Sequence, residues 1–274
     1  MDYHGLPPGC FFVDLMRIRC ICDAGTIIAI RPQKDQSMVA IEINNACRLQ
    51  TQIVGREKTP VVTIDDPILS IDALVKYALQ QADFGSGDAF VYPGVRAKLP
   101  DEYAEALAPQ LIPLLSHLYQ IPRFYTPNLI HQLFSLVTLR PDELQPLQRL
   151  PHMDNRGPWY FASVHYLNAG DHGGTGFFRH RPTGFERITD DRYESFKDAE
   201  NAHLAANGPP PEKYINESDD HFELLAEVGY RPNRMAIYPG NLLHSGLIKP
   251  DRDISDDPAT GRLTANLFFY FTPG

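Results

Sequence analysis

Two side chains that can bind a metal ion stand two positions apart in the sequence, at His152 and Asp154. If this segment is extended, residues two apart project from the same face of the chain, so one imidazole and one carboxylate can bind one ion. The best candidate for a third ligand is His244, which a β barrel would bring close although it lies far along the chain. Two histidines and one carboxylate form the facial triad of non-haem iron(II) oxygenases, which leaves coordination positions open for a cosubstrate and oxygen.

Other polar residues have weaker signals. The segment 92–96, Tyr-Pro-Gly-Val-Arg, is a tight turn next to a cation and could help to bind an anionic substrate. His165 and Tyr166 are neighbours on a predicted strand, so their side chains should face opposite sides of it. His172 and His180 flank a strand that follows Gly-Gly, and we expect them to be hydrogen-bonded or solvent-facing rather than in contact with substrate.

The candidate ligands lie in the part of the chain that is richest in β-strand signals. Short apolar runs separated by turn residues predict strands over 132–139, 159–167, 175–179, 224–228, 235–238 and 263–271. Such strands are typical of an antiparallel sandwich or barrel. Residues 181–222 interrupt them with a helix predicted over Asp190–Asn207 and closed by Gly208. An insert of that length in a β core is commonly functional, such as a lid, or a mobile connection.

The first 129 residues have a different pattern. β-prone runs at 26–30, 38–43 and 61–64 predict a small antiparallel sheet. Apolar residues at helical spacing predict helices over 71–82 and 101–119, and two prolines should bend or divide the second helix. We therefore expect an N-terminal α+β region, 1–129, packed on a β core over 130–274 that contains the 181–222 insert.

Composition and charge exclude several classes of protein. The chain has 274 residues, of which 43% are hydrophobic and 22% charged, so it is neither disordered nor a coiled coil. Its formal net charge of −9, without a basic block, argues against nucleic acid or an anionic membrane as a partner. No stretch approaches the ~18 apolar residues of a membrane span, and the first residues lack the features of a signal peptide. The cysteines complete no zinc site, and they favour free thiols in the cytoplasm: Cys10, Cys20, Cys22 and Cys47.

Four segments after residue 150 stand in a characteristic order. The first is a metal motif at 152–155. The second, at 161–177, is a strand ending in Tyr-Leu-Asn, followed by a Gly-Gly turn and an aromatic strand. The third is a strand with the distal histidine at 233–244, and the fourth is a last strand with a basic residue at 261–269. In this order they resemble the prolyl-hydroxylase-like branch of the 2-oxoglutarate- and iron(II)-dependent oxygenases. The resemblance covers residues 152–271 and does not extend to the first 130 residues.

The resemblance implies a fold, a reaction and a set of site residues. The fold would be mainly β within the α+β class, with a double-stranded β-helix (jelly-roll, cupin-like) core. The activity would be that of a dioxygenase that uses Fe(II) and 2-oxoglutarate, hydroxylates a small-molecule or peptide substrate, and releases succinate and CO2. His152, Asp154 and His244 would be the catalytic metal ligands. Arg262 would hold the C5 carboxylate of 2-oxoglutarate with its planar fork, and Tyr166 would add a hydroxyl hydrogen bond.

Two other functions fit the same residues. A metal-dependent hydrolase or isomerase on a cupin-like barrel would use the same three ligands, for example to activate a zinc-bound water, but has no evident need for an anion anchor such as Arg262. A non-catalytic module that binds 2-oxoglutarate and metal is the other alternative. Arg149 keeps it open, because many members of the resembled family have a tyrosine three residues before the first metal histidine.

Overall fold

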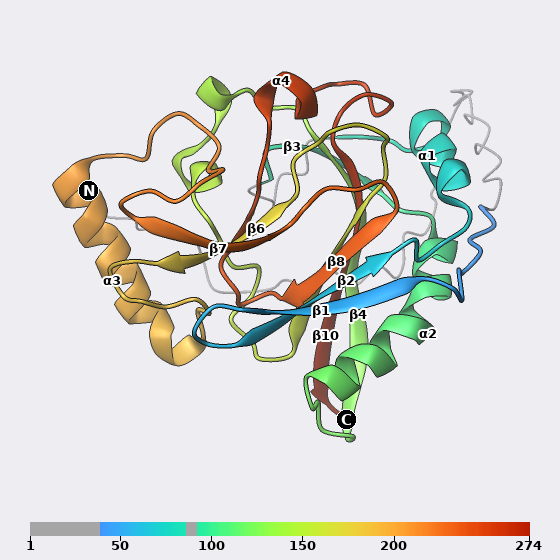
Figure 1. Cartoon of the computed structure of the whole chain (residues 1–274), viewed down its shortest axis with the longest axis horizontal. Helices are drawn as coiled ribbons and strands as arrows, with labels where there is room; N and C mark the ends of the chain where they lie inside the picture. Colours follow the sequence, from blue (N-terminus) through green and yellow to red (C-terminus); the bar gives the residue numbers. More distant parts are fainter. Residues whose placement is uncertain (1–38, 86–91) are drawn as a thin grey trace, which may run out of the picture. The chain divides into compact units, whose positions relative to one another are not determined.

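Two antiparallel sheets form the framework of the protein, in a computed structural model that describes residues 39–85 and 92–274 (Figure 1). The larger sheet has seven strands in the order β1-β2-β8-β5-β10-β4-β3, and the smaller has three in the order β7-β6-β9. The strand bounds are β1 (Arg48–Val54), β2 (Thr59–Asp65), β3 (Gly94–Lys98), β4 (Tyr125–Val137), β5 (Tyr160–Tyr166), β6 (Thr175–His180), β7 (Phe222–Val228), β8 (Arg234–Pro239), β9 (His244–Gly246) and β10 (Leu263–Pro273). The mainly β, antiparallel character predicted from the sequence is confirmed.

All six strands predicted after residue 130 are present, and β4 begins earlier than expected, at Tyr125. In the N-terminal region, the predicted run 61–64 lies within β2, which pairs with β1. The predicted run 26–30 and three of the four cysteines lie outside the described residues, and Cys47 is an exposed free thiol. The described part of the run 38–43 makes only a single bridge, between Ile43 and Ile68. The bridge goes no further because the N–H of Glu42 donates to the hydroxyl of Ser70 rather than to a backbone carbonyl.

Strands from the N-terminal region extend both edges of the larger sheet. β2 pairs with β8, with Val62 opposite Ile237. β3 pairs with β4, with Ala97 opposite Phe134. The described residues all belong to one unit, Gln36–Gly274, so the strands on either side of residue 129 share one sheet. The division into a region 1–129 and a core 130–274 stays a prediction.

The helices are α1 (Ile71–Gln80), α2 (Asp101–Leu118), α3 (Asp190–Asn207) and the single turn α4 (Pro250–Asp253), and two 3₁₀ turns lie at Pro141–Glu143 and Pro146–Arg149. The prolines were predicted to bend or divide the second helix, and division is wrong because α2 runs through Pro109 and Pro113. A bend stays a prediction. Both prolines are exposed, so the carbonyls that lack a helical N–H partner face water. α3 has the predicted bounds, and Gly208 ends it at a φ of +81°.

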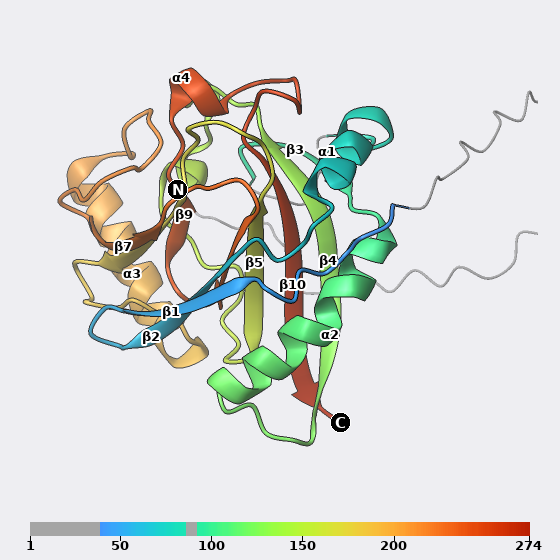
Figure 2. The same cartoon turned by 45° about the vertical axis from the view of Figure 1, so that its right-hand side comes forward.

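The two faces of the larger sheet have different partners. Leu107 and Leu115 of α2 belong to a core cluster with Phe161 of β5. On the opposite face, Tyr166 of β5 packs with Phe177 of the smaller sheet. Alternation along the strand separates the two sets of side chains. Figure 2 shows α1 and α2 on one side of β4, β5 and β10 and the strand β7 on the other. The candidate site residues lie on the side of the smaller sheet.

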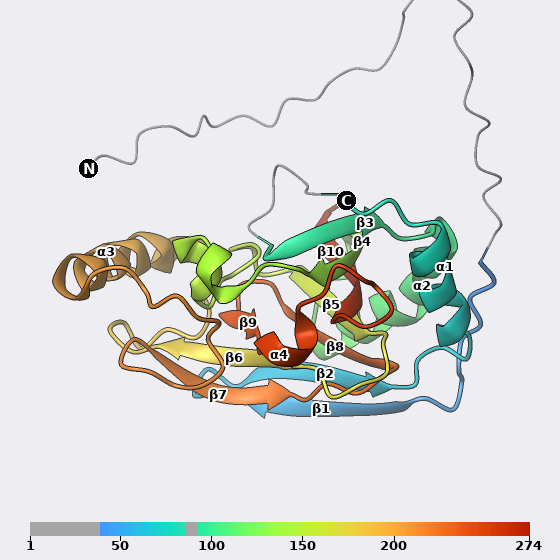
Figure 3. The same cartoon turned by 90° about the horizontal axis from the view of Figure 1, so that it is seen from above.

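The insert 181–222 lies at one end of the smaller sheet, where α3 follows β6 and precedes β7 (Figure 3). Phe196 is the one residue of α3 that is buried in the described structure. α3 therefore has little hydrophobic anchorage for a helix of 18 residues. No helix in the ranges 39–85 and 92–274 has the length and apolar character needed to cross a membrane.

Candidate metal centre

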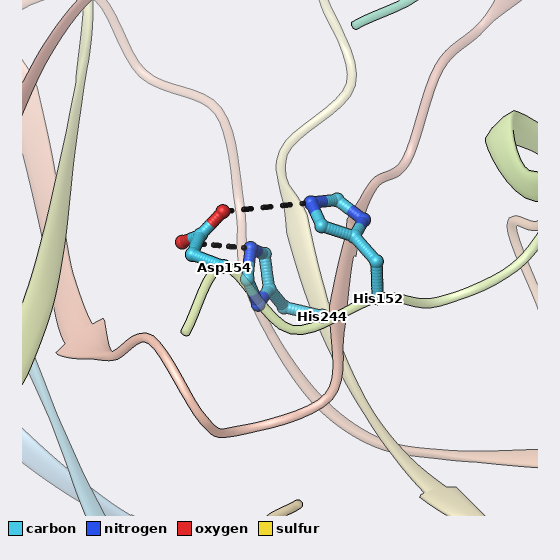
Figure 4. Close-up of side chains that lie close together, drawn as sticks. All are labelled: His152, Asp154 and His244. Carbon is cyan, nitrogen blue, oxygen red and sulfur yellow. Dashed lines mark ion pairs between the residues drawn. The ribbon is translucent and has the colours of Figure 1, made fainter. Parts of the chain in front are cut away.

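The three predicted ligands converge on one point (Figure 4). The Nε2 atom of His152 lies 3.8 Å from Oδ1 of Asp154, and Nε2 of His244 lies 3.5 Å from Oδ2 of the same carboxylate. The imidazole rings are 4.4 Å apart between centroids. Two imidazole nitrogens and two carboxylate oxygens thus surround a common space, as a metal ion with mixed nitrogen and oxygen ligands requires.

Backbone hydrogen bonds place these side chains. His152 and His244 form an antiparallel bridge in which each N–H donates to the other carbonyl at 2.9 Å. Two residues further on, the N–H of Asp154 donates to the carbonyl of Gly240 at 2.8 Å. A Cβ atom at Gly240 would lie only 2.4 Å from the ring of Tyr160, so glycine permits this close approach. The segment before β5 is thereby fixed against the turn between β8 and β9.

The electrostatic environment favours neutral histidines and a ligating tautomer. The Nδ1–H of His244 donates to the carbonyl of Leu242 at 2.7 Å, so we assign the lone pair to Nε2, which faces Asp154. Burial lowers the pKa of His244 to about 4. Desolvation and then the neighbouring His244 lower the pKa of His152 as well, although its side chain is 55% exposed. Burial raises the pKa of Asp154 above its usual value. The nearby charges of His152 and Arg96 act in the opposite direction but do not cancel the effect. Both imidazoles are thus unprotonated at neutral pH, the form that binds metal.

The predicted anion anchor is a buried cation next to the predicted tyrosine. Arg262 is 4% exposed, and its guanidinium carbon lies 5.5 Å from the ring centroid of Tyr166. Its Nε donates to the carbonyl of Gly173 at 2.7 Å and Nη2 to that of Gly174 at 3.1 Å. No carboxylate of the described residues forms an ion pair with it. Three N–H bonds, on Nη1 and Nη2, remain for another acceptor.

Tyr166 is less available than the sequence indicated. Its hydroxyl lies 2.9 Å from Oγ1 of Thr175 and 3.2 Å from the carbonyl of Val228, to which it donates. A new acceptor would therefore have to replace a bond that already exists. His165, its neighbour on β5, faces the opposite side as predicted, where its Nδ1 lies 2.8 Å from the hydroxyl of Tyr103 in α2.

Tyr92 is a candidate that the sequence did not single out, since only the turn and the cation of 92–96 were apparent. Its hydroxyl is buried and has no hydrogen-bond partner among the residues that the structure describes. Burial raises the pKa of Tyr92, and the positive charges of Arg262 and Arg96 lower it. The hydroxyl of Tyr92, which has no acceptor among the described residues, is therefore close enough to Arg262 to feel its charge. Arg262 in turn has no carboxylate partner among those residues. Such groups are expensive to bury unless a ligand completes them.

A cleft of about 420 Å³ lies beside Asp154, one of the three candidate ligands. Asp154 lines it together with Tyr270 of β10 and with Asp190 and Tyr193 of α3. Across the cleft wall, Arg156 pairs with Asp190 at 3.1 Å and lies 4.4 Å above the ring of Tyr193. The first turns of the insert helix thus border the space in front of one candidate ligand.

Comparison with known proteins places the chain in a family. Residues 45–269 match the model of a family of unknown function, DUF6445, and the chain belongs to that family. No curated protein matches the sequence.

Several solved structures are similar to this chain at low sequence identity. HygX from Streptomyces hygroscopicus, with nickel, 2-oxoglutarate and hygromycin B bound, is 15% identical, with 78% of this chain and 84% of HygX covered and a TM-score of 0.42. SnoK, a non-haem α-ketoglutarate-dependent carbocyclase from nogalamycin biosynthesis, is 11% identical, with 78% of this chain and 80% of SnoK covered and a TM-score of 0.41. AviO1 from Streptomyces viridochromogenes Tue57 is 11% identical, with coverages of 77% and 88% and a TM-score of 0.40.

Proposed function

We propose that this protein is an Fe(II)- and 2-oxoglutarate-dependent dioxygenase with a double-stranded β-helix core. The observation that carries the proposal is the His152–Asp154–His244 cluster at a cleft, in a chain that also buries a cation without a carboxylate partner among the described residues. A hydrolase or isomerase would need the three ligands but has no evident use for Arg262. An enzyme that binds a dicarboxylate next to its metal needs both.

The residues fit the metal. Two neutral imidazoles and one carboxylate are the donor set of non-haem iron(II) sites. An ion about 2.0–2.2 Å from each ligand atom holds those atoms roughly 2.9–3.5 Å apart. The two histidines lie 3.8 and 3.5 Å from different oxygens of Asp154, and one ligand atom from each residue lies within 4.8 Å of the others, so the side chains would move closer together around an ion. The bond from His244 to Leu242 would keep that ring oriented while the ion binds.

The residues also fit the far carboxylate of 2-oxoglutarate. Arg262 has donors left on Nη1 and Nη2, and the buried hydroxyl of Tyr92 needs an acceptor. A carboxylate would satisfy both groups with charge-assisted hydrogen bonds. We therefore propose Arg262 and Tyr92 as the principal anion contacts. Tyr166, whose hydroxyl is already bonded, would lie beside the guanidinium without contacting the anion through its hydroxyl.

When bound, iron(II) and 2-oxoglutarate would supply the oxidation of a substrate C–H bond by O2, with succinate and CO2 as the other products. The protein would hold the metal through three side chains and orient the cosubstrate through Arg262. The cleft beside Asp154 would admit a small-molecule or peptide substrate. Asp190 and Tyr193 of α3 border it, so we propose that the insert 181–222 forms the rim that selects substrate.

The test uses the full chain, made metal-free and reconstituted with Fe(II) without oxygen. Addition of 2-oxoglutarate and then O2 should produce succinate slowly without substrate, and faster when a screened compound is hydroxylated. Tyr193→Ala should leave the uncoupled rate unchanged. Binding of 2-oxoglutarate without succinate throughout the screen would favour the non-catalytic module. If the protein instead hydrolyses a screened compound with Zn²⁺ bound and does not bind 2-oxoglutarate, the hydrolase would be favoured.

A further inference from the structure

A second cluster of metal-binding side chains lies further along the insert helix, near its middle. His180 ends β6, His221 immediately precedes β7, and Glu200 projects from α3. Oε1 of Glu200 lies 2.9 Å from Nε2 of each histidine, and the two Nε2 atoms are 3.2 Å apart. Three ligand atoms from three elements therefore approach one another more closely than those of the first centre.

These distances suit a shared ion as well as they suit hydrogen bonds. Three atoms bound at about 2.0–2.2 Å to one ion lie roughly 2.9–3.5 Å apart. Although it is close to both rings, the buried Oε1 of Glu200 has no correctly directed hydrogen bond from any described residue.

The surroundings prepare the histidines as ligands. Nδ1 of His180 lies 2.7 Å from Oγ1 of Thr183, which also accepts the N–H of Phe185. We assign Nδ1 as the donor, and this leaves the lone pair on Nε2. The backbone of His221 is fixed by its N–H bond to Asp219 at 2.9 Å. The ring of His203 stacks on that of His221 at 3.6 Å between centroids and covers it.

We propose that His180, Glu200 and His221 form a second metal site, which binds Zn²⁺ and fastens α3 to the smaller sheet. Zinc accepts imidazole and carboxylate ligands together, and water can complete its coordination. Such a fastening would add to the anchorage of the helix, in which Phe196 is the one buried residue of the described structure. Because the first turns of α3 border the cleft at Asp154, the ion would also fix the rim of the candidate active site.

The test is made on the full, tag-free chain in which His152→Ala and Asp154→Ala remove the first centre. This background should still bind one equivalent of Zn²⁺, measured by titration after chelator treatment. At free zinc about 100 times the dissociation constant, its Tm should rise by about 5–10 °C. Adding Glu200→Gln should weaken zinc binding by more than about 100-fold, the upper cost of losing an outer-shell partner.

A matched control is His203→Gln, which removes the stacked ring but no ligand and should retain one equivalent of zinc. If Glu200→Gln does not fold, His221→Gln serves as the ligand variant. A background protein that binds no zinc, or one whose zinc affinity and Tm shift are unaffected by the ligand variant, would overturn the proposal. Since the first centre is absent throughout, these results do not depend on the proposed dioxygenase activity.

Discussion

His152 and His244 are joined by two backbone hydrogen bonds, each N–H donating to the other residue's carbonyl at 2.9 Å. Their imidazoles consequently emerge from one short bridge although they are far apart in sequence. The geometry of the candidate metal centre is therefore determined by the backbone, and Asp154 is held by its own bond to Gly240. Substitution of a ligand side chain should leave this framework intact.

Asp154→Asn should abolish metal binding at the first centre without loss of the fold. The amide keeps the size of the side chain but removes the negative charge that balances the ion, while the backbone bond to Gly240 remains. We expect affinity for Mn²⁺, as an oxygen-stable substitute for Fe(II), to fall by at least about 100-fold. Asp190→Asn, in the same cleft, is the control and should bind Mn²⁺ normally. Equal affinities in the two variants would remove Asp154 from the ligand set.

Arg262→Gln should raise the KM for 2-oxoglutarate by roughly 10- to 100-fold, because each hydrogen bond to a charged group contributes about 1.5–3 kcal/mol. Arg262→Lys should restore only part of the loss, since it lacks the planar fork. Both changes also affect the bonds to Gly173 and Gly174, so the Tm must be measured beside the kinetics. An unchanged KM in the folded Gln variant would disprove the anion contact.

Tyr92→Phe separates ligand binding from stability. The hydroxyl is buried without a partner in the described part of the chain, so its removal should leave the free energy of unfolding unchanged or higher. If the hydroxyl donates to bound 2-oxoglutarate, the KM should rise by about tenfold. Chemical denaturation and initial rates measure the two quantities. A less stable variant with unaltered KM would show that the hydroxyl serves the fold.

His165 should make the protein less stable in mild acid. It is fully buried, and desolvation lowers its pKa from 6.5 to about 4. Below pH 6.5 His165 binds a proton in the unfolded chain but stays neutral in the folded one. The free energy of unfolding therefore falls as the pH decreases from 7 toward 4. The loss from this residue is at most about 3 kcal/mol. Urea unfolding of the native chain and of His165→Gln between pH 7.5 and 5 should show a shallower dependence for the variant. Parallel curves would contradict the assignment.

Local patterns explain most of what could be predicted. The bounds of α3 follow from a helical segment closed by Gly208, and the strands after residue 130 follow from short apolar runs between turns. The approach of His244 to His152 and Asp154 was expected because the segments stand in the order of a known family. Strand alternation predicted that His165 and Tyr166 face opposite sides of β5, and they do.

Other features depend on pairings between distant segments, which no local pattern encodes. β1 and β3 lie on opposite edges of one sheet, and β9 consists of only three residues. His180 had no apparent role in the sequence, because its partners come from α3 and from the residue before β7. The need of Tyr92 for an acceptor is likewise visible only once its surroundings are known.

The position of β10 has a consequence for synthesis of the chain. This strand lies between β5 and β4 in the middle of the larger sheet. A ribosome produces both neighbours long before residues 263–273, so the nascent chain must carry two unpaired strand edges, which are sites for aggregation. Arg262 directly precedes β10. Pairing of β10 with β5 and β4 would therefore complete the larger sheet, and the same folding step would bring Arg262 to its buried position.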